Sequence, residues 1–290
     1  QKSLFRAKKI MRKFKPDIAI GVGGYASGPL LKVAASSGVP TLVQEQNSYP
    51  GVTNKLLAKK AAKICVAYEG MERFFDKEKI VLTGNPCRES LFSGVTKEEA
   101  YSFFELDPNK KTILVIGGSL GSKMINTSFS QNKDLIPDNV QVLWQSGEYY
   151  YPELYLEVAN APNKKSFKLF DFIKRMDMAY AAADLVVSRA GAGSISELSL
   201  LKKPTILVPS PNVAEDHQTK NAMALVQKKA AILVKDNEAI ETLVRTAVET
   251  VNDEVLLSEL TSNIEEFAHH DAANKIVNEV VKIVAKEVGL

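Results

Sequence analysis

The chain has 290 residues, of which 45% are hydrophobic and 24% charged, and its formal net charge is +3. This length is typical of two domains, and the composition excludes a disordered or collagen-like chain. No apolar run approaches the roughly 18 residues that a membrane-spanning helix needs. The two cysteines, Cys65 and Cys87, form no CxxC pair and follow no secretory signal, and three histidines are too few for a zinc site. We therefore expect a soluble, intracellular protein of two domains.

Charge is distributed unevenly along the chain. Residues 1–60 carry eleven basic and two acidic residues, a net charge of +9, whereas the remainder has 26 basic and 32 acidic residues, a net charge of −6. The opening stretch KSLFRAKKIMRKFK interleaves seven cations with apolar residues. A basic amphipathic helix of this kind can lie on an anionic membrane surface, or it can be the solvated face of a helix that packs on a core. These residues alone leave both interpretations open.

The first part of the chain alternates between short apolar strands and helical segments. Strands are predicted at IAIGV (18–22), TLVQE (41–45), KICVA (63–67) and KIVLT (79–83). Helices are predicted from Gly28-Pro29 onward, from Thr53 to Ala62 and from Gly70 to Phe75. This alternation is typical of a parallel sheet with helices on both faces. The small number of strands, and a chain that opens with Gln inside a helix, lead us to expect a missing N-terminal segment.

The segment GNPCRESLFSGVT (84–96) is rich in Gly, Pro, Ser and Thr and predicts a domain boundary. Six further strands are predicted at 112–118, 140–145, 167–172, 184–189, 205–210 and 230–235. From about Glu238 the pattern is purely helical and indicates packing helices. We expect an α/β fold of two Rossmann-like domains that face a cleft, each built on a doubly wound parallel sheet. The first domain, which is expected to be incomplete, is predicted at residues 1–88 and the second at residues 89–270. The last helix, 271–290, is expected to pack back on the first domain.

The loops that follow predicted strands carry the residues with chemistry, because ligands of such sheets bind there. Four loops stand out: GVGGYASGP (21–29), IGGSLGSKMIN (116–126), SRAGAGSISE (188–197) and PSPNVAEDHQTKNA (209–222). Glycines before a helix let a ligand approach the backbone and leave amides for an anion. Each turn is also an ordinary strand–helix connection, so one alone carries little information.

Two such turns in the second domain, with Glu197 after one of them, suit a diphosphate and a ribose whose hydroxyls donate to Glu197. Ser194 to Glu197 also fits a capping box, in which Glu197 reaches back to the cap amide and needs no ligand. The G-x-G-x-x-G fingerprint of dehydrogenases, the Walker A pattern and a D-x-D pair are all absent. Without a metal, helix N-termini, loop amides and Arg88 must meet the leaving-group charge. This combination favours two-domain, metal-independent sugar-nucleotide chemistry.

Six motifs in order, GGYASGP, EQNSYPGVTNK, GNPCR, IGGSLGSKMIN, SRAGAGSISEL and HQTKNA, closely resemble the MurG family of glycosyltransferases (family 28) over essentially the whole chain. The resemblance implies a GT-B fold and transfer of GlcNAc, with inversion, from UDP-GlcNAc to lipid I (undecaprenyl-pyrophosphoryl-MurNAc-pentapeptide), which forms lipid II. It thus implies a role in peptidoglycan synthesis, cell shape and cell division, with no metal, cofactor or nucleic acid. It also implies a peripheral position on the anionic cytoplasmic face of the bacterial inner membrane, with cell-wall-synthesis protein partners.

The resemblance also assigns residues to the two substrates. The donor residues that it implies are Asn47, Arg88, Ser119, Ile173, Ala192, Gly193, Ser194, Ile195, Ser196, Glu197 and Gln218. Among them, Ser119 would meet the diphosphate, the Ile173 backbone would bracket the uracil, Glu197 would bind the ribose, and Gln218 would face the GlcNAc hydroxyls. The acceptor-side residues that it implies are Tyr25, Glu45 and Asn126.

The sequence departs from the family pattern in two places. The family's GGTGGH loop lies before the start of this chain, so we expect the residues given to form an incomplete active site. Gln44 stands before EQN, where the family often has His. Glu45 is the one carboxylate in an acceptor-side motif and hence a candidate general base. It can also merely orient Asn47 or Tyr25, so the base remains open.

Two other functions remain open at this stage. A UDP-sugar transferase that acts on a diacylglycerol would share the donor loops and differ on the acceptor side. The chain could also be a catalytically incomplete module that binds a UDP-sugar. A UDP-GlcNAc 2-epimerase is disfavoured, because it would need several acids and histidines in its cleft and the chain has only three histidines.

Overall fold

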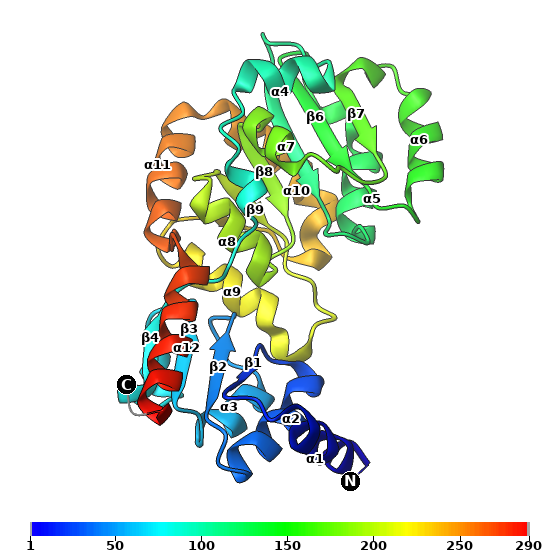
Figure 1. The fold of residues 1–290 in the computed structure, drawn as a ribbon. Helices are drawn as coiled ribbons and strands as arrows, with labels where there is room; N and C mark the ends of the chain where they lie inside the picture. The colour runs from blue at the N-terminus through cyan, green and yellow to red at the C-terminus, as the bar shows by residue number, and fades with distance from the viewer. Residues whose placement is uncertain (1, 289–290) are drawn as a thin grey trace. The chain divides into compact units, whose positions relative to one another are not determined.

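The computed structural model describes residues 2–288, which form two compact units. One unit comprises the residues up to Cys87 together with those from His269 onward, and the other comprises Arg88–Ala268. Each unit is built on one sheet whose neighbouring strands are all parallel (Figure 1). The predicted α/β class and the predicted division into four and six strands are confirmed.

The first unit has a four-stranded sheet in the order β1-β2-β3-β4. Its strands are β1 (Ala19–Gly21), β2 (Thr41–Glu45), β3 (Lys63–Val66) and β4 (Ile80–Leu82). Its helices are α1 (Lys2–Phe14), α2 (Gly24–Ser36), α3 (Val52–Ala58) and α12 (Ala272–Val288).

Both faces of this sheet are covered, which explains why its strands read as continuous apolar runs. Val43 packs in a core with Ala7 and Met11 of α1, whereas the adjacent Leu42 packs with Ile283 of α12. Successive side chains of a strand point to opposite faces, so α1 and α12 lie on opposite sides of β2. The last helix therefore belongs to the first unit.

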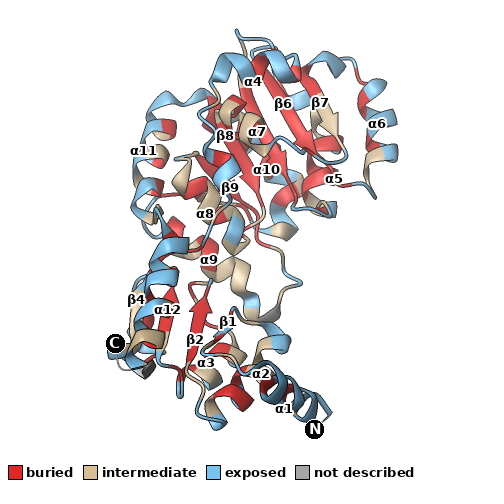
Figure 2. Cartoon of the chain, in the orientation of Figure 1, coloured by how far each residue is buried: buried red, intermediate tan, exposed pale blue. Residues whose placement is uncertain are grey.

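The second unit has a six-stranded sheet in the order β10-β9-β8-β5-β6-β7. Its strands are β5 (Lys111–Ile116), β6 (Val140–Gln145), β7 (Phe167–Phe170), β8 (Leu185–Ser188), β9 (Thr205–Leu207) and β10 (Ile232–Leu233). Its helices are α4 (Lys97–Phe104), α5 (Lys123–Gln131), α6 (Tyr151–Ala159), α7 (Met176–Ala182), α8 (Ala192–Leu200), α9 (His217–Val226), α10 (Ala239–Asn252) and α11 (Glu254–Ile264). The four inner strands, β5, β6, β8 and β9, are buried along most of their length, whereas the edge strands β7 and β10 are largely of intermediate burial (Figure 2).

The chain order of this sheet reverses between β5 and β8. Strands β6 and β7 follow β5 in one direction, and β9 and β10 follow β8 in the other. Ile116 pairs with Ser188 in the register of these two strands, so the loops that follow both strands start side by side. In doubly wound sheets this point is where ligands bind. The fold thus brings two of the predicted glycine-rich turns together.

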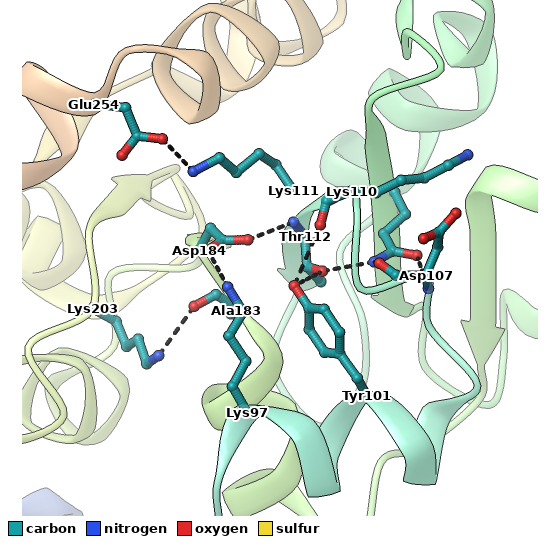
Figure 3. A network of polar contacts seen from close by, with 11 residues as sticks. Lys97, Tyr101, Asp107, Lys110, Lys111, Thr112, Ala183, Asp184, Lys203 and Glu254 are labelled. Carbon is teal, nitrogen blue, oxygen red and sulfur yellow. Dashed lines mark hydrogen bonds and ion pairs between the residues drawn. The ribbon is translucent and has the colours of Figure 1, made fainter.

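A network of polar contacts ties the opposite ends of the same strands to their surroundings (Figure 3). The Asp184 carboxylate accepts hydrogen bonds from the Thr112 backbone N–H at 2.8 Å and from the Lys97 ammonium at 2.5 Å. Lys203 donates to the Ala183 carbonyl at 3.0 Å, and burial lowers the pKa of this lysine to about 8. The network connects α4, β5 and the turns before β8 and β9.

One predicted helix is wrong. The segment from Gly70 to Phe75 contains only a single 3-10 turn, Met71–Arg73. Gly70 adopts a left-handed conformation with φ 72°, and six residues offer too few hydrogen bonds to offset the cost of helix nucleation. The predicted helix from Thr53 also ends early, at Ala58.

Candidate functional site

The turn after β5 requires glycine for steric reasons. Gly118 and Gly121 have φ of +89° and +79°, and a Cβ atom on Gly121 would lie 1.9 Å from the Ser146 carbonyl oxygen. Ser122 then caps α5 by accepting a hydrogen bond from the Ile125 N–H. Within residues 2–288, the backbone N–H of Ser119, an exposed residue of this turn, donates to no backbone carbonyl. The turn therefore offers a free amide and a hydroxyl beside a helix N-terminus, which suits an anion.

The turn after β8 also leads into a helix with an open start. Gly191 is the N-cap of α8, and no side chain caps this end. A Cβ atom added to Gly193 would meet nothing within 4 Å, so a ligand can approach the backbone closely there. The predicted capping box at Ser194 and Glu197 is wrong, because the helix starts before Ser194 and that residue is not the cap.

Glu197 is held by two side chains of the second unit. The Tyr180 hydroxyl donates to Oε2 of Glu197 at 3.0 Å, and Nη2 of Arg88 lies 3.6 Å from Oε1. The Glu197 side chain is 19% exposed and that of Arg88 is 67% exposed. The carboxylate thus keeps a fixed orientation and remains partly open to solvent, as a ribose-binding group requires. Two residues that were predicted separately, Arg88 and Glu197, come together.

The Ile173 backbone is only partly available to a ligand. Its N–H donates to Oε1 of Gln145 at 2.8 Å, and Ile173 itself is 3% exposed. Because Gln145 occupies the Ile173 N–H, the predicted contact with a uracil would have to be made by the Ile173 carbonyl oxygen. The same Gln145 side chain donates from Nε2 to the Gly118 carbonyl at 3.2 Å.

Gln218 lies in the first turn of α9 and is oriented by the backbone. Its Oε1 accepts a hydrogen bond from the Ser210 N–H at 2.8 Å, which turns the amide nitrogen away from this contact. The preceding residues Glu215 and Asp216 have φ of 54° and 53°. Consecutive left-handed residues other than glycine store strain, and such strain is concentrated at functional sites.

In the first unit, the Glu45 carboxylate is saturated with donors. Oε1 accepts from the N–H and side-chain amide of Asn47, and Oε2 accepts from the Gly51 N–H and the Asn54 side-chain amide. Glu45 is also only 2% exposed. A substrate hydroxyl could pass its proton to this carboxylate only by displacing one of these donors. Glu45 is therefore a positioning residue for the loop that carries Asn47, and its candidacy as general base is not supported.

The other two acceptor-side residues differ sharply in exposure. Tyr25 lies in the first turn of α2 and is 94% exposed, so its ring is accessible. Asn126 is 3% exposed in the second unit, where it donates to the Ser146 carbonyl and accepts from the Trp144 indole N–H. This core role corrects the acceptor-side assignment of Asn126, because its amide is used to tie α5 to β6.

Three organising side chains were not singled out from the sequence: Gln145, Tyr180 and Arg189. Nη1 of Arg189 donates to the Pro209 carbonyl at 3.1 Å and pairs with Asp236 at 2.5 Å, which fixes the loop after β9. A polar residue that ends an apolar strand, as in VQVLWQ and LVVSR, was an available signal for Gln145 and Arg189. The sequence carries no such signal for Tyr180, because a tyrosine in an apolar helix predicts only core packing.

Comparisons with known proteins decide the family. Residues 112–276 match the glycosyltransferase family 28 C-terminal domain, and residues 1–66 match the family's N-terminal domain. A relative from Parabacteroides distasonis is 59% identical over 99% of this chain and 78% of its own length. The chain belongs to glycosyltransferase family 28.

Two similar proteins carry the same name. The Parabacteroides distasonis protein is named UDP-N-acetylglucosamine--N-acetylmuramyl-(pentapeptide) pyrophosphoryl-undecaprenol N-acetylglucosamine transferase. A Flavobacterium psychrophilum protein of the same name is 49% identical over 98% of this chain and 77% of its own length. The crystal structure of Acinetobacter baumannii MurG, at 28% identity, superposes with a TM-score of 0.78 over 96% of this chain and 78% of that one.

A more distant likeness is limited to the fold. The structure of S. aureus MnaA with UDP is 15% identical, with a TM-score of 0.69 over 96% of this chain and 79% of that one.

Within residues 2–288, no group of three or more His, Cys, Asp or Glu side chains could hold a metal ion. No helix in the same range has both the length and the apolar character needed to cross a membrane.

Proposed function

We propose that this family 28 chain transfers GlcNAc from UDP-GlcNAc to lipid I, with inversion and without a metal, and so forms lipid II. The observation that carries the proposal is the name shared by relatives that are 59% and 49% identical over almost the whole chain. The two glycine-rich turns at the strand-order reversal of the second unit support it, because they provide amides for a diphosphate.

On the donor side, each group would bind the part of UDP-GlcNAc that its chemistry suits. The Ser119 turn and the open start of α8, residues 192–196, would take the diphosphate. Glu197, oriented by Tyr180, would accept from ribose hydroxyls. The Ile173 carbonyl would accept from uracil N3–H, a donor that cytosine lacks. The Gln218 amide nitrogen would donate to a GlcNAc hydroxyl.

Arg88 and the first unit would serve the leaving group and the acceptor. The Arg88 side chain is 67% exposed, and its cation would help to neutralise the departing UDP. Tyr25 is accessible on α2, and Glu45 holds Asn47 in place. We assign no general base, because four donors already occupy the carboxylate of Glu45, the one candidate that the sequence offered.

Helix α1 supports attachment to an anionic membrane surface, which we place at the cytoplasmic face. One stripe, with Ala7 and Met11, packs into the core, while Phe5 and Phe14 are each 76% exposed. A groove between α1 and α2 is lined by four cations, Lys8, Arg12, Lys15 and Lys32. Exposed aromatic rings beside a cluster of cations are typical of helices that lie in a lipid headgroup layer.

Calorimetric titration with UDP, using ADP as the control, tests the donor half of the proposal. We expect UDP to bind and ADP to bind at least about tenfold more weakly, because only a uracil offers N3–H to the Ile173 carbonyl. Equal binding of the two nucleotides, or binding of neither, would contradict the proposed donor site.

UDP release in the presence of UDP-GlcNAc tests the acceptor half. Release that depends on lipid I would support the proposed reaction, and release that depends on diacylglycerol would favour the related lipid glycosyltransferase. UDP binding without turnover on either lipid would contradict the proposed transfer by this chain and would fit a UDP-sugar-binding module or an incomplete active site.

A further inference from the structure

We propose that Gln145 is a positioning residue that keeps the diphosphate turn and the uracil loop of the donor site at a fixed separation. This inference rests on the proposed donor function. Gln145 is the last residue of β6, is 4% exposed and forms a hydrogen bond to one backbone group in each of the two loops.

The position of β6 in the sheet allows one side chain to reach both loops. Strand β6 lies between β5 and β7, so its carboxyl end is flanked by the loop after β5 and the loop after β7. On one side, Nε2 of Gln145 donates to the Gly118 carbonyl at 3.2 Å. On the other side, Oε1 accepts from the Ile173 N–H at 2.8 Å. Gln145 is therefore a bridge between the two loops.

The residues after Gln145 pack against the same two loops. The Ser146 and Gly147 N–H groups donate to the Phe170 and Asp171 carbonyls at 2.9 and 3.0 Å. A Cβ atom on Gly147 would lie 2.5 Å from the Leu120 carbonyl oxygen, so the turn after β5 is also in close contact. These contacts set the loops near each other, and the Gln145 side chain fixes the orientation of one peptide group in each.

The two partners require an amide side chain of this length. The Gly118 carbonyl needs a donor and the Ile173 N–H needs an acceptor, so glutamate can serve only the second and leucine neither. The Gly118 carbonyl also accepts from the Gly121 N–H at 3.1 Å, so it is held by two donors. A carbonyl held in this way cannot turn toward the phosphate oxygens, which it would repel. Gln145 thus acts on the diphosphate through Gly118 and on the uracil through Ile173.

The same strand provides a matched control. Gln141 lies at the opposite end of β6, is also 4% exposed, and bonds to both backbone groups of Asp107 at 2.9 Å. It therefore resembles Gln145 in burial and in its hydrogen bonds to backbone, but it lies near the start of the strand rather than beside the two loops. Gln141 also donates to the Thr112 hydroxyl at 3.0 Å, so Gln141→Leu should cost at least as much folding stability as Gln145→Leu without affecting nucleotide binding.

The test is calorimetric titration of the whole chain with UDP, CDP and uridine, together with thermal denaturation of each variant. Gln145→Leu should weaken UDP binding about tenfold, because a buried hydrogen bond is lost in each loop, and should narrow the preference for UDP over CDP. Gln141→Leu should stay within about twofold of the original UDP affinity, while its Tm falls at least as far as that of Gln145→Leu.

Gln145→Glu distinguishes the contribution of one loop from that of the other. It also replaces the leucine variant in the test if that variant does not fold. It keeps the acceptor for the Ile173 N–H and loses the donor to Gly118, so uridine should bind almost as before while UDP binds about tenfold more weakly. Equal UDP affinities for the Gln145 variants and Gln141→Leu would overturn this inference alone. An unsubstituted chain that fails to bind UDP would overturn the proposed function and, with it, this inference.

Discussion

Side chains acquire their roles from partners that lie far away in the sequence. Glu197 was predicted from the loop that precedes it, but its orientation depends on Tyr180 and Arg88. Glu45 was a candidate base from its motif, but four N–H donors around it leave it a positioning role. A motif identifies the residue type that a position needs, whereas the contacts around that residue decide whether it can react.

Glu197→Ala should weaken UDP binding by about 10- to 100-fold, because hydrogen bonds from the ribose to a charged acceptor are lost. The measurement is calorimetric titration of both proteins with UDP and with 2′,3′-dideoxy-UDP. The dideoxy nucleotide is the control, since it lacks the hydroxyls and should bind the two proteins equally. Unchanged UDP affinity would leave Glu197 as a partner of Tyr180 and Arg88 only.

At the scale of elements, the two ends of the second sheet differ in chemistry. The carboxyl ends of β5 and β8 lead into turns with open amides, whereas the amino ends are tied together by the network around Asp184 (Figure 3). Lys203 is part of that network, and burial lowers its pKa from 10.5 to about 8. Its ammonium is therefore less favourable in the folded chain than in the unfolded chain.

The sign of the resulting pH dependence follows from proton uptake. Between pH 8 and 10.5 the unfolded chain binds more protons at Lys203 than the folded chain does, so the free energy of unfolding should rise with pH across this window. The increase should reach at most about 3 kcal/mol. Lys203→Met should remove this contribution, as measured by urea denaturation at several pH values. Parallel stability curves for the two proteins would contradict the shifted pKa.

For the whole molecule, seven of the eleven cations of residues 1–60 lie on α1 or directly after it, at Lys15. We expect vesicles that contain phosphatidylglycerol to retain the chain at low salt and to release it at high salt. Salt shortens the screening length from about 10 Å at 0.1 M to about 3 Å at 1 M. Replacing both Lys8 and Arg12 by Glu should weaken retention at least about tenfold, given roughly 1 kcal/mol per cation.

A matched variant keeps this experiment specific to α1. Lys164→Glu with Lys165→Glu changes the net charge equally, at two exposed lysines of the second unit, and should leave vesicle retention almost unchanged. Equal losses in both variants would mean that only net charge matters. Retention that ignores salt would mean a mainly apolar contact through residues such as Phe5 and Phe14.

The sequence by itself determined the class, the strands and the family. Runs such as ILVI and LVV predict strands buried on both faces, because this pattern is local. Ten strands were predicted, and ten occur within residues 2–288. The short segment from Gly70 failed as a helix because local propensity cannot offset nucleation without tertiary support. The six ordered motifs placed the chain in a family that the matches to residues 1–66 and 112–276 confirm.

Only the tertiary structure decided which polar atoms remain available. Gln145 reaches Gly118 and Ile173, which lie 27 and 28 residues away in the sequence, because parallel pairing sets three strand ends side by side. Asn126 was removed from the candidate site in the same way, since its amide is used inside the core. Hydrogen-bond saturation depends on every neighbour in space, and a parallel sheet draws those neighbours from distant parts of the chain.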